Sequence, residues 1–288
     1  MEKHLLLTVT DDARSIFEAE FIGSFFKHKE QIRVTLFSVV PKSQDEGNDV
    51  SRGAQDSNTP VAHHHRDKWQ NAIQLKRELL LHLGFLDDHI TSKVVRSSNG
   101  IIQDIILEGK KGHYDAVFLA RHATELLGQT FSTSVTGEIL NHKIDFPVWV
   151  CRHPEIGRRN VLLCVDDDEA SMRIAEHVGF VLQQEAEHNI TLFHVDAGLK
   201  RSNAHGILDR ARQVLTDHGI SDARIRSLLI QSHKVAKSIR EEAERGAYAV
   251  IAIGHERAEP TGPKDWLVDS RCMTALGMLN QCVLWVSR

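Results

Sequence analysis

The feature that constrains the fold most is an internal repeat that spans nearly the whole chain of 288 residues. Residues 5–15 (LLLTVTDDARS) recur 156 positions later as residues 161–171 (VLLCVDDDEAS), and six of the eleven pairs are identical. Residues 114–120 then match residues 248–254 at an offset of 134, so the first copy carries 22 extra residues. Solenoid repeats have periods of about 20 to 50 residues, so this repeat indicates a duplicated domain.

Each copy predicts an alternation of strands and helices. An apolar run such as residues 161–165 is typical of a strand buried on both faces, as in a parallel sheet. Phenylalanines occupy every fourth position over Phe17–Phe25, which is the spacing of one helix face. Strands alternating with helices indicate βαβ units with right-handed crossovers. We therefore expect an α/β fold of two tandem doubly wound domains, residues 1–153 and 159–288. Each should contain a five-stranded, mostly parallel sheet with helices on both faces.

The expected elements follow the repeat in order, with residues 153–157 as the linker. We expect strands at residues 4–9, 33–40, 90–96, 114–120 and 147–151, and again at 160–165, 190–195, 224–230, 249–253 and 282–287. We expect helices at residues 12–28, 67–84, 101–112 and 134–142, and again at 169–187, 203–218, 234–245 and 270–279.

Charge and composition exclude several classes of partner. A formal net charge of −4 lacks the basic footprint that binding to nucleic-acid phosphates requires. Apolar runs are far shorter than a membrane span and the first residues do not form a signal peptide, so we expect a cytoplasmic protein without membrane contact. None of the cysteines forms a C-x-x-C pair, so buried, reduced thiols are expected at Cys151, Cys164, Cys272 and Cys282.

Four features recur in order in each half. They are an acidic residue after the first strand, a T-L-F-x-V second strand, a fourth strand that opens on tyrosine, and a valine-containing last strand. Together they resemble a universal stress protein domain present in tandem, and the resemblance implies strand order 3-2-1-4-5 in each sheet. An apolar last strand at a sheet edge can pair with other chains and aggregate. In the family this edge is commonly covered by dimerisation. We expect the last strands of the two halves to pair as an intramolecular pseudo-dimer, with a homodimer and a protein partner as further options.

The resemblance also implies an adenine-nucleotide site, such as one for ATP, at the carboxyl ends of the strands. The family places an Asp opposite adenine, a Val backbone beside the base and a G-x2-G-x9-G-[ST] loop around the phosphates. Glycines let backbone N–H groups approach phosphate, and most of them are absent here, so weak binding is expected. The candidate nucleotide-binding residues are Asp166, Val195, Gly254, His255, Arg257 and Ser270.

The first half departs further from the family pattern. Thr10 stands where the acidic residue is expected, and Asp11 comes one position later. Ala120 and Ala123 replace two glycines of the phosphate loop, and each added β-carbon narrows the cradle. We therefore expect a nucleotide, if one binds, to occupy the second half.

Two residue clusters have competing interpretations. Residues Asp166–Asp168 could contact a ligand or Mg²⁺, or they could cap the following helix and interact with its dipole. Residues His63–His65 invite a metal interpretation, but three consecutive imidazoles match no known metal-site spacing. We favour a solvated loop or helix start for the histidines and expect neither a metal site nor catalytic residues.

Three functional hypotheses follow. The first is a tandem universal stress protein, a stress-response module that acts by binding and is not an enzyme. The second is an interaction scaffold that holds no nucleotide. The third is a nucleotide hydrolase, which the sequence supports least because it shows neither a P-loop nor a paired base and nucleophile.

Residues 41–66 generate a first prediction. They are rich in polar side chains, glycine and proline, and they account for the extra length of the first half, so we predict a surface loop. Limited proteolysis should cut here first, and shortening the loop to the length found in the second half should change the melting temperature little. Loss of folding in the shortened chain would contradict the prediction.

Overall fold

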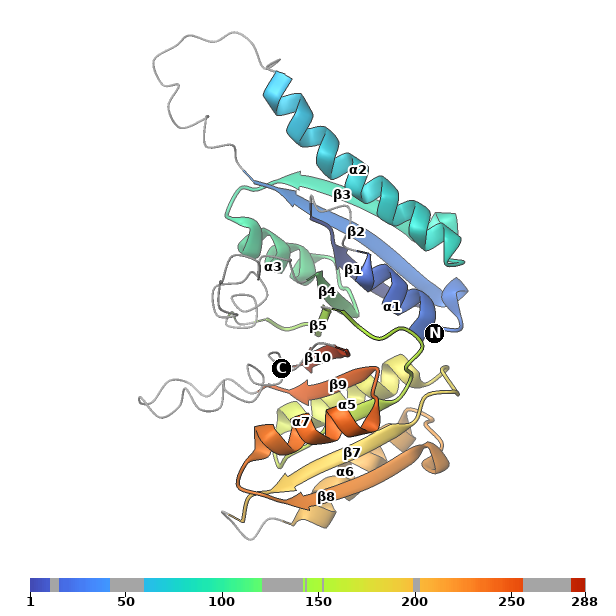
Figure 1. Cartoon of the computed structure of the whole chain (residues 1–288), viewed down its shortest axis with the longest axis vertical. Coiled ribbons are helices and arrows are strands. Elements are labelled where there is room, and N and C mark those ends of the chain that lie inside the picture. The colour runs from blue at the N-terminus through green and yellow to red at the C-terminus, as the bar shows by residue number, and fades with distance from the viewer. Residues whose placement is uncertain are drawn as a thin grey trace, which may run out of the picture.

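The computed structural model describes residues 1–10, 16–41, 60–120, 142, 144–151, 153–198, 203–255 and 281–287, with only the backbone at 60–67, 120 and 151. Its ten strands form one continuous sheet in the order β3-β2-β1-β4-β5-β10-β9-β6-β7-β8. The two halves lie end to end along the long axis of the molecule (Figure 1). Each half has the predicted strand order 3-2-1-4-5, and the two five-stranded sheets are joined edge to edge.

The first half contains five strands and three described helices. The strands are β1 (Lys3–Thr8), β2 (Ile32–Val40), β3 (Ile90–Arg96), β4 (Ala116–Ala120) and β5 (Val148–Cys151). The helices are α1 (Phe17–Phe25), α2 (Pro60–His82) and α3 (Ile101–Lys111), with short 3₁₀ turns at Lys29–Gln31 and Asp87–His89.

The second half repeats this series. Its strands are β6 (Val161–Cys164), β7 (Ile190–Asp196), β8 (Ile225–Gln231), β9 (Val250–Gly254) and β10 (Val283–Ser287). Its helices are α5 (Glu169–Leu182), α6 (Ala204–Asp217) and α7 (Val235–Gly246), and a 3₁₀ turn spans Asp222–Arg224. All ten predicted strands are confirmed, while the predicted helices at 134–142 and 270–279 lie outside the described residues.

The predicted loop at residues 41–66 is too long. Helix α2 begins at Pro60, whereas the sequence placed its start near residue 67. Proline suits the first turn of a helix, because its missing N–H would be unpaired there and its φ angle is already helical. Part of the insertion therefore lengthens α2, which has 23 residues against 14 in α6. Residues 42–59 lie outside the described ranges.

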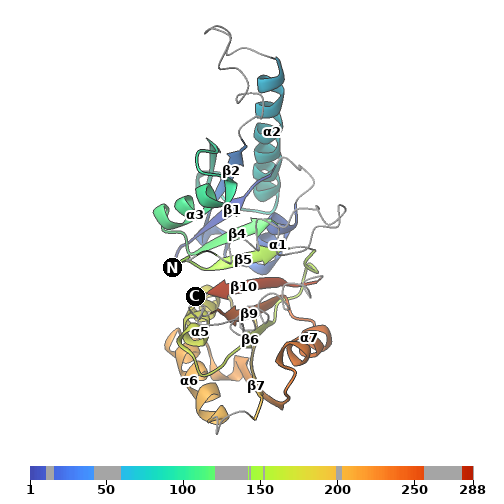
Figure 2. The same cartoon turned by 90° about the vertical axis from the view of Figure 1, so that its left-hand side faces the viewer.

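The sheet is covered on both faces. One apolar layer lies beneath α1, α2, α5 and α6, and a second lies beneath α3 and α7. Figure 2 shows α2 and α3 on opposite sides of the upper half, and α6 and α7 on opposite sides of the lower half. Cys164 and Cys282 are buried, as predicted for these two, and burial raises the pKa of Cys282 to about 12. Within the described ranges, none of the helices has the length and apolarity of a membrane crossing.

The two halves meet at a seam formed by β5 and β10. These strands pair antiparallel, with Trp149 opposite Trp285, whereas the other ladders between described strands are parallel. The two indoles stack with centroids 4.4 Å apart and planes 9° apart, and both side chains are fully buried. The predicted pairing of the last strands is confirmed, and it hides both apolar edges from other chains.

The seam departs from twofold symmetry at one hydrogen bond. Trp149 Nε1 donates to Nε2 of His177 on α5, at 2.9 Å. The repeat offset places Phe21 of α1 at the position that corresponds to His177. Among the described residues, Trp285 Nε1 has no hydrogen-bond partner. The Trp149 N–H therefore has a hydrogen-bond acceptor across the seam, whereas the Trp285 N–H has none among the described residues.

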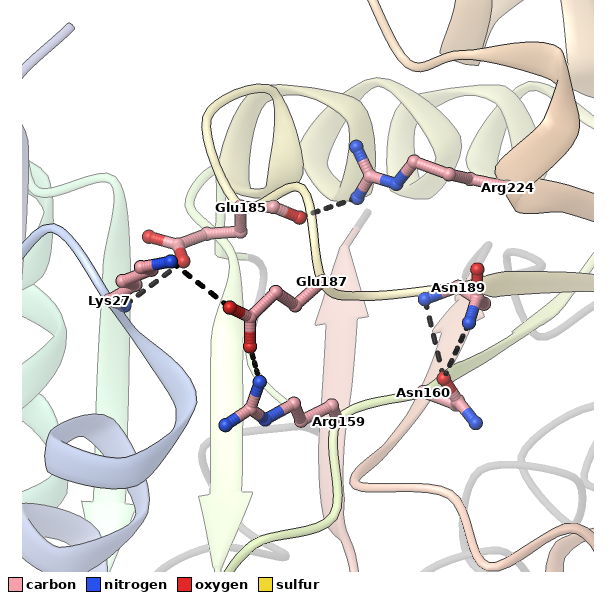
Figure 3. A network of polar contacts seen from close by, with 7 residues as sticks. All are labelled: Lys27, Arg159, Asn160, Glu185, Glu187, Asn189 and Arg224. Carbon is pink, nitrogen blue, oxygen red and sulfur yellow. Dashed lines mark hydrogen bonds and ion pairs between the residues drawn. The ribbon is translucent and has the colours of Figure 1, made fainter.

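Polar contacts extend the seam beyond the strands, as Figure 3 shows. The backbone N–H of Lys27 donates to Glu185 Oε2 at 3.0 Å, and its ammonium group pairs with Glu187 at 3.0 Å. Arg159 also pairs with Glu187, and Arg224 donates to the backbone carbonyl oxygens of Glu185 and His188. The pairs to Glu187 are exposed, so each contributes at most about 1 kcal/mol, and apolar burial at the seam dominates.

The seam generates a second prediction. Replacing Trp285 with alanine should lower the free energy of unfolding by about 3 to 5 kcal/mol, because it removes a fully buried indole and its stacking contact with Trp149. Urea denaturation of the full chain measures this loss. The matched control is Leu75→Ala, whose side chain is 50% exposed and should cost less than about 0.5 kcal/mol. A loss below about 1 kcal/mol for Trp285→Ala would show that the seam is not an energetic centre.

Candidate functional site

Four of the six candidate residues lie at one edge of the second-half sheet. Asp166 follows β6, Val195 lies near the end of β7, and Gly254 ends β9 with His255 next to it. Strands β7 and β9 both pair in parallel with β6, so their carboxyl ends meet at this edge. Ligands bind at this edge in open α/β sheets. Arg257 and Ser270 lie outside the described residues.

The acidic cluster divides into distinct roles. Asp168 is the N-cap of α5, and its Oδ1 accepts the backbone N–H of Ser171 at 2.6 Å. Asp167 is exposed and pairs with Arg210 at 3.3 Å. Asp166 is half-buried, its N–H donates to Ser171 Oγ at 2.8 Å, and its Oδ1 accepts the N–H of Asp167 at 2.9 Å. Capping therefore explains Asp168, while the Asp166 carboxylate remains a candidate for ligand contact.

Gly254 has a packing role that the sequence did not reveal. A β-carbon built at this position would lie 2.3 Å from the backbone carbon of Ala170 and 2.6 Å from the nitrogen of Ser171. Both atoms belong to the first turn of α5, so β9 passes very close to the start of that helix. Only glycine fits this approach, with or without a ligand.

His255, a candidate nucleotide-binding residue, has a buried side chain. Its side chain is 6% exposed, and its backbone N–H donates to the carbonyl oxygen of Ser287 on β10 at 2.9 Å. This bond continues the β9–β10 ladder past the end of β9. The residue thus joins the candidate edge to the seam strand.

His194 is a polar residue at this edge that the sequence analysis missed. Its Nδ1 lies 2.8 Å from the carbonyl oxygen of Val165 and must donate, because a carbonyl only accepts. Its Nε2 is buried and has no hydrogen-bond partner in the described part of the chain. Ser38 occupies the corresponding place in the first half, and its buried Oγ is likewise unpartnered there. The only sequence sign was the change from T-L-F-S-V to T-L-F-H-V.

The corresponding edge of the first half carries different groups. Thr10 stands at the position of Asp166, and Thr8 replaces Cys164. The Thr8 hydroxyl donates to the carbonyl oxygen of Phe118 at 3.1 Å, which ties β1 to β4. Asp11 and Ala123 fall in segments that the structure does not describe. The first half thus has a hydroxyl where the second half has a carboxylate.

The described residues contain no cluster suited to binding a metal ion. Across the described segments, no group of three or more His, Cys, Asp or Glu residues could hold a metal ion. Residues His63–His65, for which a loop or a helix start was favoured, belong to the first turns of α2.

Comparison with solved structures identifies the fold. A universal stress protein from Archaeoglobus fulgidus superposes with a TM-score of 0.68 over 99% of this chain and 96% of its own, at 16% sequence identity. The chain has the fold of a universal stress protein, present twice. A protein of unknown function from Pseudomonas aeruginosa also superposes on this chain, with a TM-score of 0.56, 13% identity, and coverage of 99% of this chain and 92% of its own. No family model and no curated protein matches the sequence.

The packing of Gly254 generates a third prediction. Gly254→Ala should lower the free energy of unfolding by about 1 to 3 kcal/mol without any ligand, because the added carbon collides with backbone atoms. The matched control is Gly23→Ala in α1, where the nearest atom is the flexible end of Leu83 at 2.8 Å. Alanine also stabilises a helix by about 0.5 to 1 kcal/mol relative to glycine, so the control should change the free energy of unfolding little. Equal unfolding free energies for the two variants would contradict the role of Gly254.

Proposed function

We propose that this protein is a cytoplasmic binding module of the tandem universal stress protein type that takes an adenine nucleotide, weakly, in its second half. The observation that carries the proposal is the half-buried carboxylate of Asp166, at the edge where β6, β7 and β9 end. Its Oδ1 accepts one backbone N–H, and a carboxylate has about four lone-pair sites in all. We propose that this carboxylate also accepts a hydrogen bond from the amino group of adenine.

The strand register supports the place of the base. Strand β6 pairs with β7 as far as Cys164 opposite Phe193, and the N–H of Val165 then donates to the Phe193 carbonyl. Backbone groups in a strand alternate between its two sides, so those of Val195 face the β6 side again, beyond the last of these bonds. A base seated beside Asp166 would meet a backbone donor and acceptor there.

The phosphate end of the site is the reason for expecting weak affinity. The first turn of α5 fills the space beside Gly254, so the missing side chain of this residue does not open space for phosphate. Arg257 and Ser270 remain proposed phosphate contacts, since a guanidinium can bind phosphate through two parallel hydrogen bonds. These two side chains replace, at best in part, a cradle of backbone N–H groups.

An interaction scaffold without nucleotide is the second candidate. The enclosed His255 side chain and the filled space at Gly254 favour it, since both narrow the candidate edge. The two halves already form an intramolecular pseudo-dimer through β5 and β10. A homodimer of the whole chain and a protein partner are parts of this proposal. Binding without turnover is proposed for both candidates.

A titration distinguishes the candidates and gives the fourth prediction. Calorimetry of the full chain with ATP should give weak binding at one site per chain, and Asp166→Ala should weaken it at least about tenfold, the effect of one charge-assisted hydrogen bond. The matched control is Asp167→Ala, which removes an exposed neighbouring carboxylate that pairs with Arg210. Thr10→Ala should also leave binding unchanged, because it alters only the first half.

Each alternative has its own outcome. Two sites per chain, or binding that Asp166→Ala leaves intact, would overturn the assignment to the second half. No heat with the wild-type chain would favour the scaffold, and identification of the molecules that co-purify with the chain would then name its partner.

A further inference from the structure

Two histidines of the second half are buried against aromatic rings of the first half at the seam. His177 lies on α5 beside Trp149, with ring centroids 5.9 Å apart. His188 follows α5 and lies against Phe25 of α1, with centroids 4.3 Å apart. Their side chains are 8% and 2% exposed. Both imidazoles therefore lie buried at the contact between the two halves.

The hydrogen bond of His177 requires the neutral ring. An indole N–H can only donate, so the Nε2 atom that it contacts at 2.9 Å must carry a lone pair. A proton on that nitrogen would face the Trp149 N–H and abolish the bond. Trp285 is the second aromatic neighbour, at 5.7 Å, and it offers no anion to balance a charge. Burial alone lowers the pKa of His177 to about 3.

His188 also favours the neutral form. Neither ring nitrogen has a hydrogen-bond partner within the described part of the chain. Burial is the main cause that lowers the pKa of His188 to about 4. Glu185 opposes the shift through its charge and backbone, whereas Arg224 and Arg159 add to it. The Glu185 carboxylate already accepts the N–H of Lys27, so it is shared with another donor at the seam.

The strands that join the halves form a short ladder. Strands β5 and β10 share three residue pairs, as do β1 and β4 within the first half, whereas β1 and β2 share six and β7 and β8 share seven. Each half also keeps its own five-stranded sheet and its own helices if the seam opens. Opening the seam therefore breaks only the three residue pairs between β5 and β10 and leaves the ladders within each half intact.

We propose that the seam is an acid-sensitive hinge, at which proton uptake by His177 and His188 separates the halves before either half loses its fold. Each histidine has a lower pKa in the closed state than the ordinary value of about 6.5 expected once it is exposed. The open state therefore binds more protons, and closure is fully favoured above pH 6.5 and weakens as the pH falls. Each histidine changes the ratio of closed to open molecules by about tenfold per pH unit. Together the two histidines change the ratio of closed to open molecules about a hundredfold per pH unit down to pH 4. Below pH 4 His177 alone changes this ratio, down to about pH 3.

The full chain tests the hinge in an acid titration, which is the fifth prediction. Protection factors of the β5 and β10 amides, which correct for the slower intrinsic exchange in acid, should fall at a higher pH than the loss of far-ultraviolet circular dichroism. The exchange of β2 and β7 amides, inside each half, should follow the later transition. His177→Phe installs the residue that the first half has at Phe21, and it should reduce the dependence from about a hundredfold to about tenfold per pH unit.

Two further variants complete the test. His188→Phe should reduce the dependence in the same way as His177→Phe, and the exposed His82→Gln should leave it unchanged. If His177→Phe does not fold at neutral pH, the wild-type exchange pattern and His188→Phe still decide. Simultaneous loss of seam protection and circular dichroism, or an unchanged pH dependence in the folded variants, would overturn the hinge.

Discussion

The stacked pair of Trp149 and Trp285 is the contact on which the overall arrangement depends. Each indole is fully buried, and each lies on a strand that would otherwise be an open sheet edge. Because these two edge strands pair, the two open sheets form one sheet of ten strands. Helix α5 reaches this contact through His177, which accepts a hydrogen bond from Trp149.

The duplicated fold supports two different chemistries at corresponding places. Phe21 occupies the repeat position of His177, but its ring lies against Phe25 and Phe118, whereas His177 accepts a hydrogen bond from Trp149. The same contrast holds at the sheet edge, where Thr10 in one half corresponds to Asp166 in the other. Backbone geometry tolerates these exchanges because the strand ladders do not depend on them. One half can therefore keep structural contacts while the other retains polar groups.

The sequence predicted the fold well, because the repeat places each strand twice and both copies had to agree. It also predicted the Trp149–Trp285 seam, because two apolar edge strands require a cover. It could not predict that His177 reaches Trp149, since that contact depends on how two distant segments pack. For the same reason it assigned Gly254 to a ligand, whereas the nearest atoms belong to α5. The start of α2 was missed because its first residues, 60–66, show no apolar periodicity in the sequence.

The candidate site was predictable in place but not in detail. Chain order put Asp166, Val195 and Gly254 at one edge, and parallel pairing brought these strand ends together. Side-chain roles were less accessible. Helix capping was one of two interpretations of the acidic cluster, and the structure assigns it to Asp168, whereas the unpartnered nitrogen of His194 depends on packing that residue spacing does not encode.

The order of the strands has a consequence for synthesis of the chain. Trp149 and Trp285 are 136 positions apart, and the whole second half lies between them. The first half can therefore fold while its β5 edge still lacks a neighbour, and that apolar edge stays open until β10 leaves the ribosome. Nascent chains in this interval expose a strand edge to one another, a known route to misassembly of multidomain proteins. The last strand of the second half thus acts, in time as well as in space, as the cover of the first.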